Sequence, residues 1–135
     1  MYKTIQLETP KGDSLTDMTD QVRGVVRESG IQSGICFILV PHTTAAITIN
    51  SYLDPNTARD IVSEVRRIVP TRTDFYHIFD TPSDAAGHIK ATLVGNSEVV
   101  LIDEGDLVLG HSQGLLFFDF DGPRTRRVLV KIIEG

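Results

Sequence analysis

Three of the four histidines in this chain, His42, His77 and His88, lie at the expected ends of regular elements or on a short predicted helix. Asp84 precedes His88 by four residues, so a helix would place both side chains on nearly the same side. A carboxylate beside an imidazole can orient the ring, raise its basicity or share a proton with it. Three neutral imidazoles with an open fourth position form a known catalytic zinc site. The chain has no HExxH or CxxC motif, so spacing leaves open a shared metal site or three unrelated polar histidines.

Positive charge gathers in two places that could hold a phosphate group. Lys90 lies on the short helix, and Arg124, Arg126 and Arg127 follow the turn expected at DGP. Guanidinium groups match phosphate geometry, and the backbone N–H groups at the helix start near Ser83 could add to them. Arg124 and Arg126 would share one face of a strand, while Arg127 would face the other way. The alternative is that these arginines are ordinary solvent-exposed residues at the end of a strand.

Two further stretches are more polar than their expected structure requires. HTTAAITIN carries Thr43 and Asn50, and it begins with a histidine that the kink at Pro41 would turn into a polar pocket. GHSQGLLFFDFDGPR places Gln113 and Asp119 around a very apolar strand. We expect Thr43, Asn50 and Gln113 to contact a ligand, although Gln113 and Asp119 could also be ordinary turn or solvent-facing residues.

Hydrophobic spacing and turn residues predict the element order β-α-β-β-α-α-β-β-β-β. The first helix has Leu15 and Met18 on its apolar face and stops at Gly30, while the second and third begin at caps formed by Asp54 and Ser83. The expected strands are residues 4–8, 35–40, 45–50, 97–102, 107–110, 114–121 and 126–133. Strands and helices do not alternate as in a doubly wound fold, so the predicted class is α+β with a mostly antiparallel sheet.

Length and composition are those of an ordinary globular domain. The 135 residues suffice for a single domain, residues 1–135, with a composition of 41% hydrophobic and 23% charged residues. A net charge of −5 argues against a nucleic-acid or membrane-surface binder. No apolar run reaches the roughly 18 residues of a membrane span. The lone Cys36 and a first segment without a signal-peptide core lead us to expect a buried thiol in a cytoplasmic protein.

Several motifs taken together resemble the YjbQ-like family. PHTTAAITIN, the DP helix start, DAAGHIKATLVGNSE, LVLG and FFDFDGPRTR occur in the family's order and cover nearly the whole chain. The resemblance implies a small α+β protein, an antiparallel two-sheet β-sandwich with a few helices, assembled as a homotrimer. It also implies a weak secondary thiamine-phosphate synthase activity, which joins a pyrimidine diphosphate to a thiazole phosphate.

The resemblance also implies roles for single residues. The family's polar positions match His42, His77, Asp84, His88, Gln113 and Arg124 of this chain. With these matches added, we expect metal ligands at His42, His77 and His88, catalytic roles for Asp84 and Lys90, and substrate contacts from Thr43, Asn50, Gln113, Arg124 and Arg126. The expected cofactor is a divalent ion, zinc by ligand type or magnesium with a diphosphate substrate. The expected partner is a phosphorylated small molecule.

The chain departs from the family's pattern around this predicted site. Ser51 and Asp119 stand where the family commonly has glutamate. Residues 110–114 read GHSQG in place of GTWQG, so Ser112 stands where the family has a tryptophan that could stack on an aromatic ring, and His111 adds an imidazole there. These departures bear on the substrate and the activity that the resemblance implies more than on the implied fold. A metal-dependent hydrolase, a non-catalytic metal- or anion-binding trimeric module and a structural trimer therefore remain as alternatives.

A trimer would also account for the apolar run LLFF, residues 115–118. One face of this strand would serve the core, whereas Phe118 and its same-face neighbours would need a cover. We expect other copies of the chain to supply that cover, and we expect neither nucleic acid nor a membrane as a partner.

Overall fold

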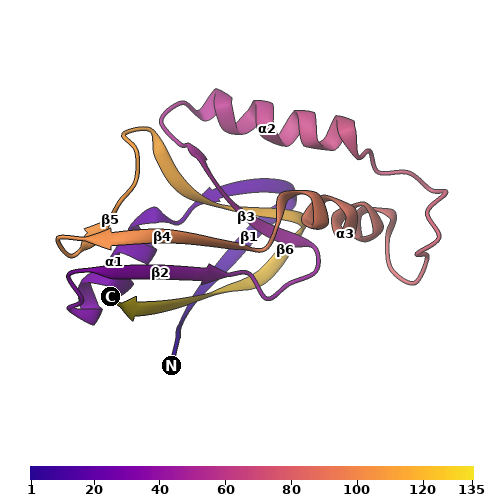
Figure 1. The fold of residues 1–135 in the computed structure, drawn as a ribbon. Helices are drawn as coiled ribbons and strands as arrows, with labels where there is room; N and C mark the ends of the chain where they lie inside the picture. The colour runs from indigo at the N-terminus through magenta and orange to yellow at the C-terminus, as the bar shows by residue number, and fades with distance from the viewer.

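Six antiparallel strands form one sheet in the computed structural model, which describes residues 1–135, and three helices lie beside it (Figure 1). The elements are β1 (Lys3–Asp17), α1 (Thr19–Ser29), β2 (Gly34–Leu39), β3 (Ala45–Ser51), α2 (Pro55–Ile68), α3 (Pro82–Val94), β4 (Ser97–Asp103), β5 (Asp106–Leu107) and β6 (Gln113–Glu134). The strand order is β1-β6-β2-β4-β5, and β3 also pairs with β6. The predicted α+β class with an antiparallel sheet is confirmed.

The long strand β6 organises the sheet. Its first part pairs with β3, its last part pairs with β2, and β1 follows it along most of its length. Register shifts around Gly12 interrupt the β1–β6 pairing, and the sheet curls into a half-barrel (Figure 1). Because every strand belongs to one hydrogen-bonded sheet, the predicted two-sheet sandwich is not confirmed.

β6 also merges two strands that were predicted to be separate. The segment DGPR, expected to be a turn, continues the strand. Its Gly122–Pro123 peptide bond is cis, and Gly122 lies opposite Gly12 of β1. A side chain at position 122 would overlap the backbone oxygen of Pro10. The glycine is therefore needed because the two main chains approach each other closely at this bend.

Side chains of β6 enter two cores on opposite faces of the sheet. Leu115 and Phe117 join the main core, which also contains residues of α1. Phe118 and Phe120 face the other side, where apolar residues of α2 and α3 pack against them. Burial on both faces explains the uninterrupted apolar run. The predicted need for a partner to cover Phe118 is therefore wrong, because this residue is only 1% exposed in a single chain.

Local capping explains the helix ends that were predicted correctly. The Asp54 carboxylate accepts a hydrogen bond from the Asn56 N–H at 2.9 Å, which confirms the cap of α2. α3 ends at Gly95 as predicted. Its N-terminal cap is the hydroxyl of Thr81, and not the predicted hydroxyl of Ser83.

α1 begins later than predicted. β1 continues through the expected KGDS turn, so Leu15 lies on the strand and the helix starts at Thr19. Cys36 is a buried free thiol, as predicted. None of the helices combines the length and the apolar character needed to cross a membrane.

Candidate metal centre

Two imidazoles and one carboxylate converge near the start of α3. The Nε2 atoms of His77 and His88 lie 3.0 and 3.1 Å from one atom, Oδ2 of Asp84. The three potential ligand atoms lie within 4.8 Å of one another. Asp84 is buried, whereas the side chains of His77 and His88 are 43% and 40% exposed. The cluster is therefore accessible from solvent on its histidine side.

Helix geometry positions two of these groups. Asp84 and His88 are four residues apart on α3 and so project from the same side of the helix. The Thr81 hydroxyl accepts the Asp84 N–H at 3.1 Å and secures the first turn. Between the two groups in the sequence, Gly87 packs so closely on the residue before β3 that an added Cβ would lie 3.2 Å from Thr44 Cβ. This close packing holds α3 against the sheet.

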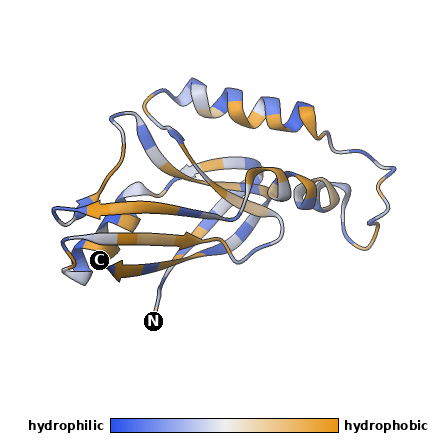
Figure 2. Ribbon diagram, in the orientation of Figure 1, coloured by the Kyte–Doolittle hydropathy of each residue, from blue (hydrophilic) through white to orange (hydrophobic).

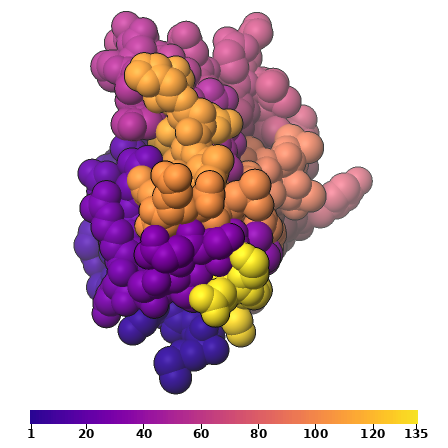
Figure 3. Space-filling view, turned by 60° about the vertical axis from the view of Figure 1, so that its left-hand side comes forward, coloured from indigo at the N-terminus to yellow at the C-terminus, as the bar shows by residue number.

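The third group comes from the long connection between α2 and α3, which projects from the body of the molecule (Figures 1 and 3). The neighbours of His77 in this segment, Tyr76 and Ile78, are exposed. The His77 ring meets the His88 ring in an edge-on arrangement with centroids 5.2 Å apart. Contacts with His88 and Asp84 thus tie the projecting segment back to α3.

The charge balance of the cluster favours an ionised aspartate. Burial alone would raise the pKa of Asp84, but hydrogen bonds from His77 and His88, together with their positive charge, outweigh burial and lower this pKa. Asp84 is therefore a carboxylate at neutral pH and offers only acceptor lone pairs.

These groups fit a divalent metal ion. Imidazole nitrogen and carboxylate oxygen are both zinc ligands, and three protein ligands with an open position are typical of catalytic zinc sites. Tetrahedral zinc with ligands at about 2.0 Å places neighbouring ligand atoms about 3.3 Å apart. The histidine–aspartate distances of 3.0 and 3.1 Å are close to that value, and the two imidazoles have only to come within the same range of each other from a separation of at most 4.8 Å.

His42, the third predicted metal ligand, does not belong to this cluster. Its Nε2 atom accepts a hydrogen bond from the backbone N–H of Arg127 at 3.0 Å. Burial, and then the positive charge of Arg126, lower the pKa of His42 and keep the ring neutral. The third member of the cluster is the carboxylate of Asp84, and not the predicted His42 imidazole.

A polar groove leads from His42 to the cluster. It consists of two adjoining hollows of about 420 and 610 Å³, which share His42, Thr43 and Asn96. His88 borders the smaller hollow and Asp84 borders the larger one. The larger hollow is also lined by Asp80, Arg124 and Arg126. We refer to the two hollows together as the polar groove.

The two arginines predicted to bind substrate have different environments. Arg126 is buried, and its guanidinium donates to both oxygens of Asp119 at 2.8 and 2.9 Å and to the Thr44 hydroxyl at 2.8 Å. Arg124 is exposed and donates to the Asp121 carboxylate at 2.8 Å. Arg126 therefore links β6 to the residue before β3 through hydrogen bonds. Arg124 is the arginine that a ligand in the groove could approach.

Lys90, predicted to be catalytic, faces β1 and does not line the groove. Its Nζ atom donates to Asp13 Oδ2 at 2.7 Å, and the residue is only 1% exposed. The ammonium also lies 5.9 Å from the centre of the Phe120 ring. Two residues after His88, Lys90 points from a different side of the helix. It forms an internal ion pair, and this position does not fit the predicted catalytic role.

Of the remaining predicted contacts, only Thr43 borders the groove. Asn50 lies at the far end of β3, where its side chain accepts the N–H of Ser51 at 2.7 Å. Gln113 lies opposite Ser51, and its side chain accepts the N–H of Gly110 at 2.7 Å. Asn50 and Gln113 therefore bond to nearby backbone and do not line the groove.

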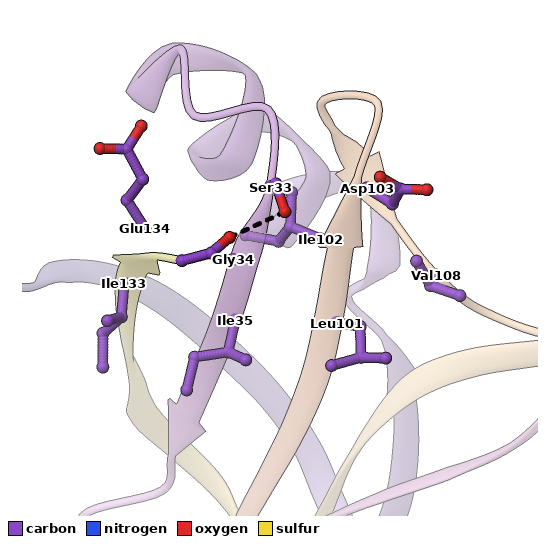
Figure 4. Close-up of a pocket in the computed structure, with 10 residues that line it drawn as sticks. Ser33, Gly34, Ile35, Leu101, Ile102, Asp103, Val108, Ile133 and Glu134 are labelled. Atoms are coloured by element: carbon purple, nitrogen blue, oxygen red, sulfur yellow. Dashed lines mark hydrogen bonds between the residues drawn. The ribbon is translucent and has the colours of Figure 1, made fainter.

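A further hollow of about 630 Å³ lies along β2, β4 and the end of β6 (Figure 4). Ile35, Leu101 and Ile133 give it an apolar lining, and its only ionisable side chains are those of Asp103 and Glu134. It lacks the imidazoles and the converging ligand atoms of the polar groove. The groove is thus the better candidate for chemistry.

Sequence and fold both match known proteins over nearly the whole chain. The model of the family described as UPF0047 protein YjbQ-like matches residues 3–135. The chain belongs to the YjbQ family. UPF0047 protein MJ1081 of Methanocaldococcus jannaschii is 43% identical over 128 residues, which cover 95% of this chain and 91% of that protein. UPF0047 protein YugU of Bacillus subtilis is 38% identical over 133 residues, which cover 98% and 99% of the two chains.

The solved structures include a YbjQ-like protein of unknown function from Sulfolobus solfataricus. It has a TM-score of 0.94 and 33% sequence identity to this chain, and the match covers 100% of this chain and 97% of that one. The resemblance to the YjbQ family is thus confirmed. The thiamine-phosphate synthase activity expected from it is wrong, because these relatives carry only family names and none is described with that activity.

Two features of the site in this YjbQ-family chain were not predicted. The four-residue spacing of Asp84 and His88 was interpreted as a carboxylate orienting an imidazole, but the same spacing lets both groups act as ligands. Asn96 lies just after the Gly95 stop of α3 and borders both hollows of the groove. Asn96 lies within the segment DAAGHIKATLVGNSE, but no role was assigned to it, because its place at the groove depends on how α3 packs on the sheet.

Proposed function

We propose that this protein is a divalent-metal-dependent hydrolase whose ion, zinc by ligand preference, is held by His77 Nε2, Asp84 Oδ2 and His88 Nε2. The observation that carries the proposal is the convergence of these three atoms within 4.8 Å. Two histidines and one carboxylate are a ligand set of catalytic zinc. Structural zinc sites have four protein ligands, whereas three converge here.

The surroundings of the cluster favour hydrolysis of a small anionic substrate. A divalent ion supplies Lewis-acid chemistry to an oxygen ligand. The exposed sides of His77 and His88 leave that chemistry accessible to water and substrate. The polar groove is large enough for a small molecule and carries the Arg124 guanidinium on its lining. The substrate we propose is a phosphorylated small molecule, cleaved by water.

Metal binding is the first test. Zinc titrated into metal-free protein, followed by calorimetry, should bind one ion per chain. His77→Ala, Asp84→Asn and His88→Ala should each weaken binding by more than the roughly 10–100-fold loss typical of residues that only support a ligand. His111→Ala is the matched control, because it removes an exposed imidazole elsewhere. Equal zinc affinity of the wild type and the triple variant would disprove the site.

Hydrolysis is tested separately with the zinc-loaded protein. It should release nitrophenolate from p-nitrophenyl phosphate, a chelator should stop the release, and added zinc should restore it. Asp84→Asn should lose this activity together with the metal. A protein that binds zinc at the cluster but cleaves neither p-nitrophenyl phosphate nor p-nitrophenyl acetate would refute the hydrolase and leave the metal site intact.

A further inference from the structure

The main chain of β6 selects the tautomer of a histidine in the polar groove. His42 Nε2 lies 3.0 Å from the backbone nitrogen of Arg127. A backbone N–H can only donate, so Nε2 must be the acceptor and carries no proton. In a neutral imidazole the proton is then on Nδ1. His42 is therefore a hydrogen-bond donor through one defined nitrogen.

The surroundings of His42 oppose a second proton on the ring. A proton on Nε2 would point directly at the Arg127 N–H. The charges of Arg126 and Arg127 also disfavour the imidazolium. Asp119, the carboxylate that would favour it, is bound by Arg126 at 2.8 Å. The ring thus offers one donor and no free acceptor.

The free donor belongs to a donor-rich part of the groove. No protein group is hydrogen-bonded to Nδ1 of His42, and the ring lines both hollows together with Thr43 and Asn96. Arg124 adds a guanidinium to the larger hollow, where Asp80 is the one carboxylate besides the proposed metal ligand. Neutral and charged donors around one hollow suit the acceptor oxygens of an anion.

We propose that His42 Nδ1–H and Arg124 form an oxyanion subsite, which binds a phosphate or carboxylate group of the substrate beside the metal centre. The placing of this group next to the reacting bond rests on the proposed function. The donors themselves belong to the protein and are present without a metal. Because the His42 ring has no free acceptor, the subsite selects an oxygen acceptor over an amine at this position.

The tautomer is measured first, on metal-free protein, by long-range ¹H–¹⁵N spectra of the histidine rings. The His42 signals are those missing from both His42→Gln and His42→Asn. We expect a proton on Nδ1 and an unprotonated Nε2. A proton on Nε2 would overturn the inference.

Two substitutions then separate the roles of the ring nitrogens. His42→Gln can keep an acceptor near the position of Nε2 but lacks the Nδ1 donor, whereas His42→Asn keeps an amide donor near Nδ1. Phosphate and acetate are titrated into each protein, with and without zinc. His42→Gln should weaken binding of the preferred anion about 10–100-fold, the effect of one hydrogen bond to a charged group, and His42→Asn should weaken it less. Unchanged affinity in His42→Gln would overturn the subsite.

The titrations also distinguish this inference from the proposed function. Tighter binding of phosphate than of acetate assigns a phosphate group to the subsite, and the reverse assigns a carboxylate. A wild type that binds no zinc but binds phosphate through His42 would refute the metal centre and support the subsite. A wild type that binds zinc, with phosphate affinity independent of His42, would refute the subsite alone.

Discussion

Neighbouring residues on α3 divide between chemistry and structure. Asp84 and His88 face the proposed metal centre, whereas Lys90 is buried against Asp13 of β1. The difference follows from helix geometry, since residues four apart share a side and residues two apart do not. A spacing of two residues between a histidine and a lysine therefore does not show that the two act together.

Lys90→Met should destabilise the protein without affecting the metal site. The substitution leaves the Asp13 carboxylate buried and deprived of its 2.7 Å partner. Removal of one member of a buried ion pair typically costs about 3–5 kcal/mol. Arg66, 3.8 Å from Asp13, should hold the loss near the lower end. Chemical denaturation measures the free energy of unfolding.

The matched control is Lys11→Met, because Lys11 is exposed. Its effect should stay within about 0.5 kcal/mol. A folded Lys90→Met variant that fails to bind zinc would contradict the structural role assigned to Lys90.

His42 should make stability depend on pH. Its pKa in the folded protein is lowered from 6.5, so below that pH the unfolded chain takes up a proton that the folded chain does not. The free energy of unfolding should therefore fall as pH drops through 6.5 toward the folded pKa, and the slope that His42 contributes should fade at pH values well above 6.5. Denaturation of wild type and His42→Gln across this range should give a flatter curve for the variant. Parallel curves would contradict the lowered pKa.

At the scale of elements, local signals and tertiary packing differ in what they allow the sequence to predict. The Asp54 cap and the Gly95 stop depend on a few adjacent residues, and both predictions are confirmed. The bend in β6 depends on its pairing with β1, so DGPR was interpreted as a turn between two strands. The same limit applied to the site. The pair Asp84–His88 was recognised from spacing, but the separation of His42 from it required the fold.

Gly122→Ala should destabilise the folded protein at the place where β1 and β6 approach each other closely. The added methyl would overlap the Pro10 backbone oxygen, and the main chain cannot move aside as a flexible side chain can. Overpacking of this kind typically costs about 1–3 kcal/mol. Gly24→Ala is the control, because the site is on α1 with no atom within 4 Å of the added Cβ. It should stabilise the helix by about 0.5–1 kcal/mol. Equal unfolding midpoints for the two variants would contradict the close approach.

At the scale of the whole molecule, the part of the sheet formed by β2 and β4 presents an exposed apolar surface, beyond the part that α2 and α3 cover. Figure 2 shows hydrophobic colour along β2 and β4. Phe37 pairs with Val99, and Ile35 pairs with both Leu101 and Ile133, so these side chains share one face. Val99 and Leu101 are 52% and 60% exposed. This face, and not the buried Phe118, is where we now propose that copies of the chain associate into the expected homotrimer.

Val99→Lys combined with Leu101→Lys should convert the proposed trimer to monomers, because two charges would be buried in the contact. Light scattering at micromolar concentration measures the mass of each form. Leu53→Lys is the control, since Leu53 is 55% exposed but does not belong to this sheet face. A wild type that remains monomeric would exclude this assembly, and a double variant that stays oligomeric would exclude this face.

The most direct test of the metal centre is anomalous diffraction at the zinc edge from crystals of zinc-loaded protein. We expect one strong peak per chain, about 2.0–2.2 Å from His77 Nε2, Asp84 Oδ2 and His88 Nε2, with a non-protein ligand completing the coordination. Crystals of Asp84→Asn should lose most of the peak. A zinc peak at His42 or His111, or none at the three predicted atoms, would contradict the metal centre.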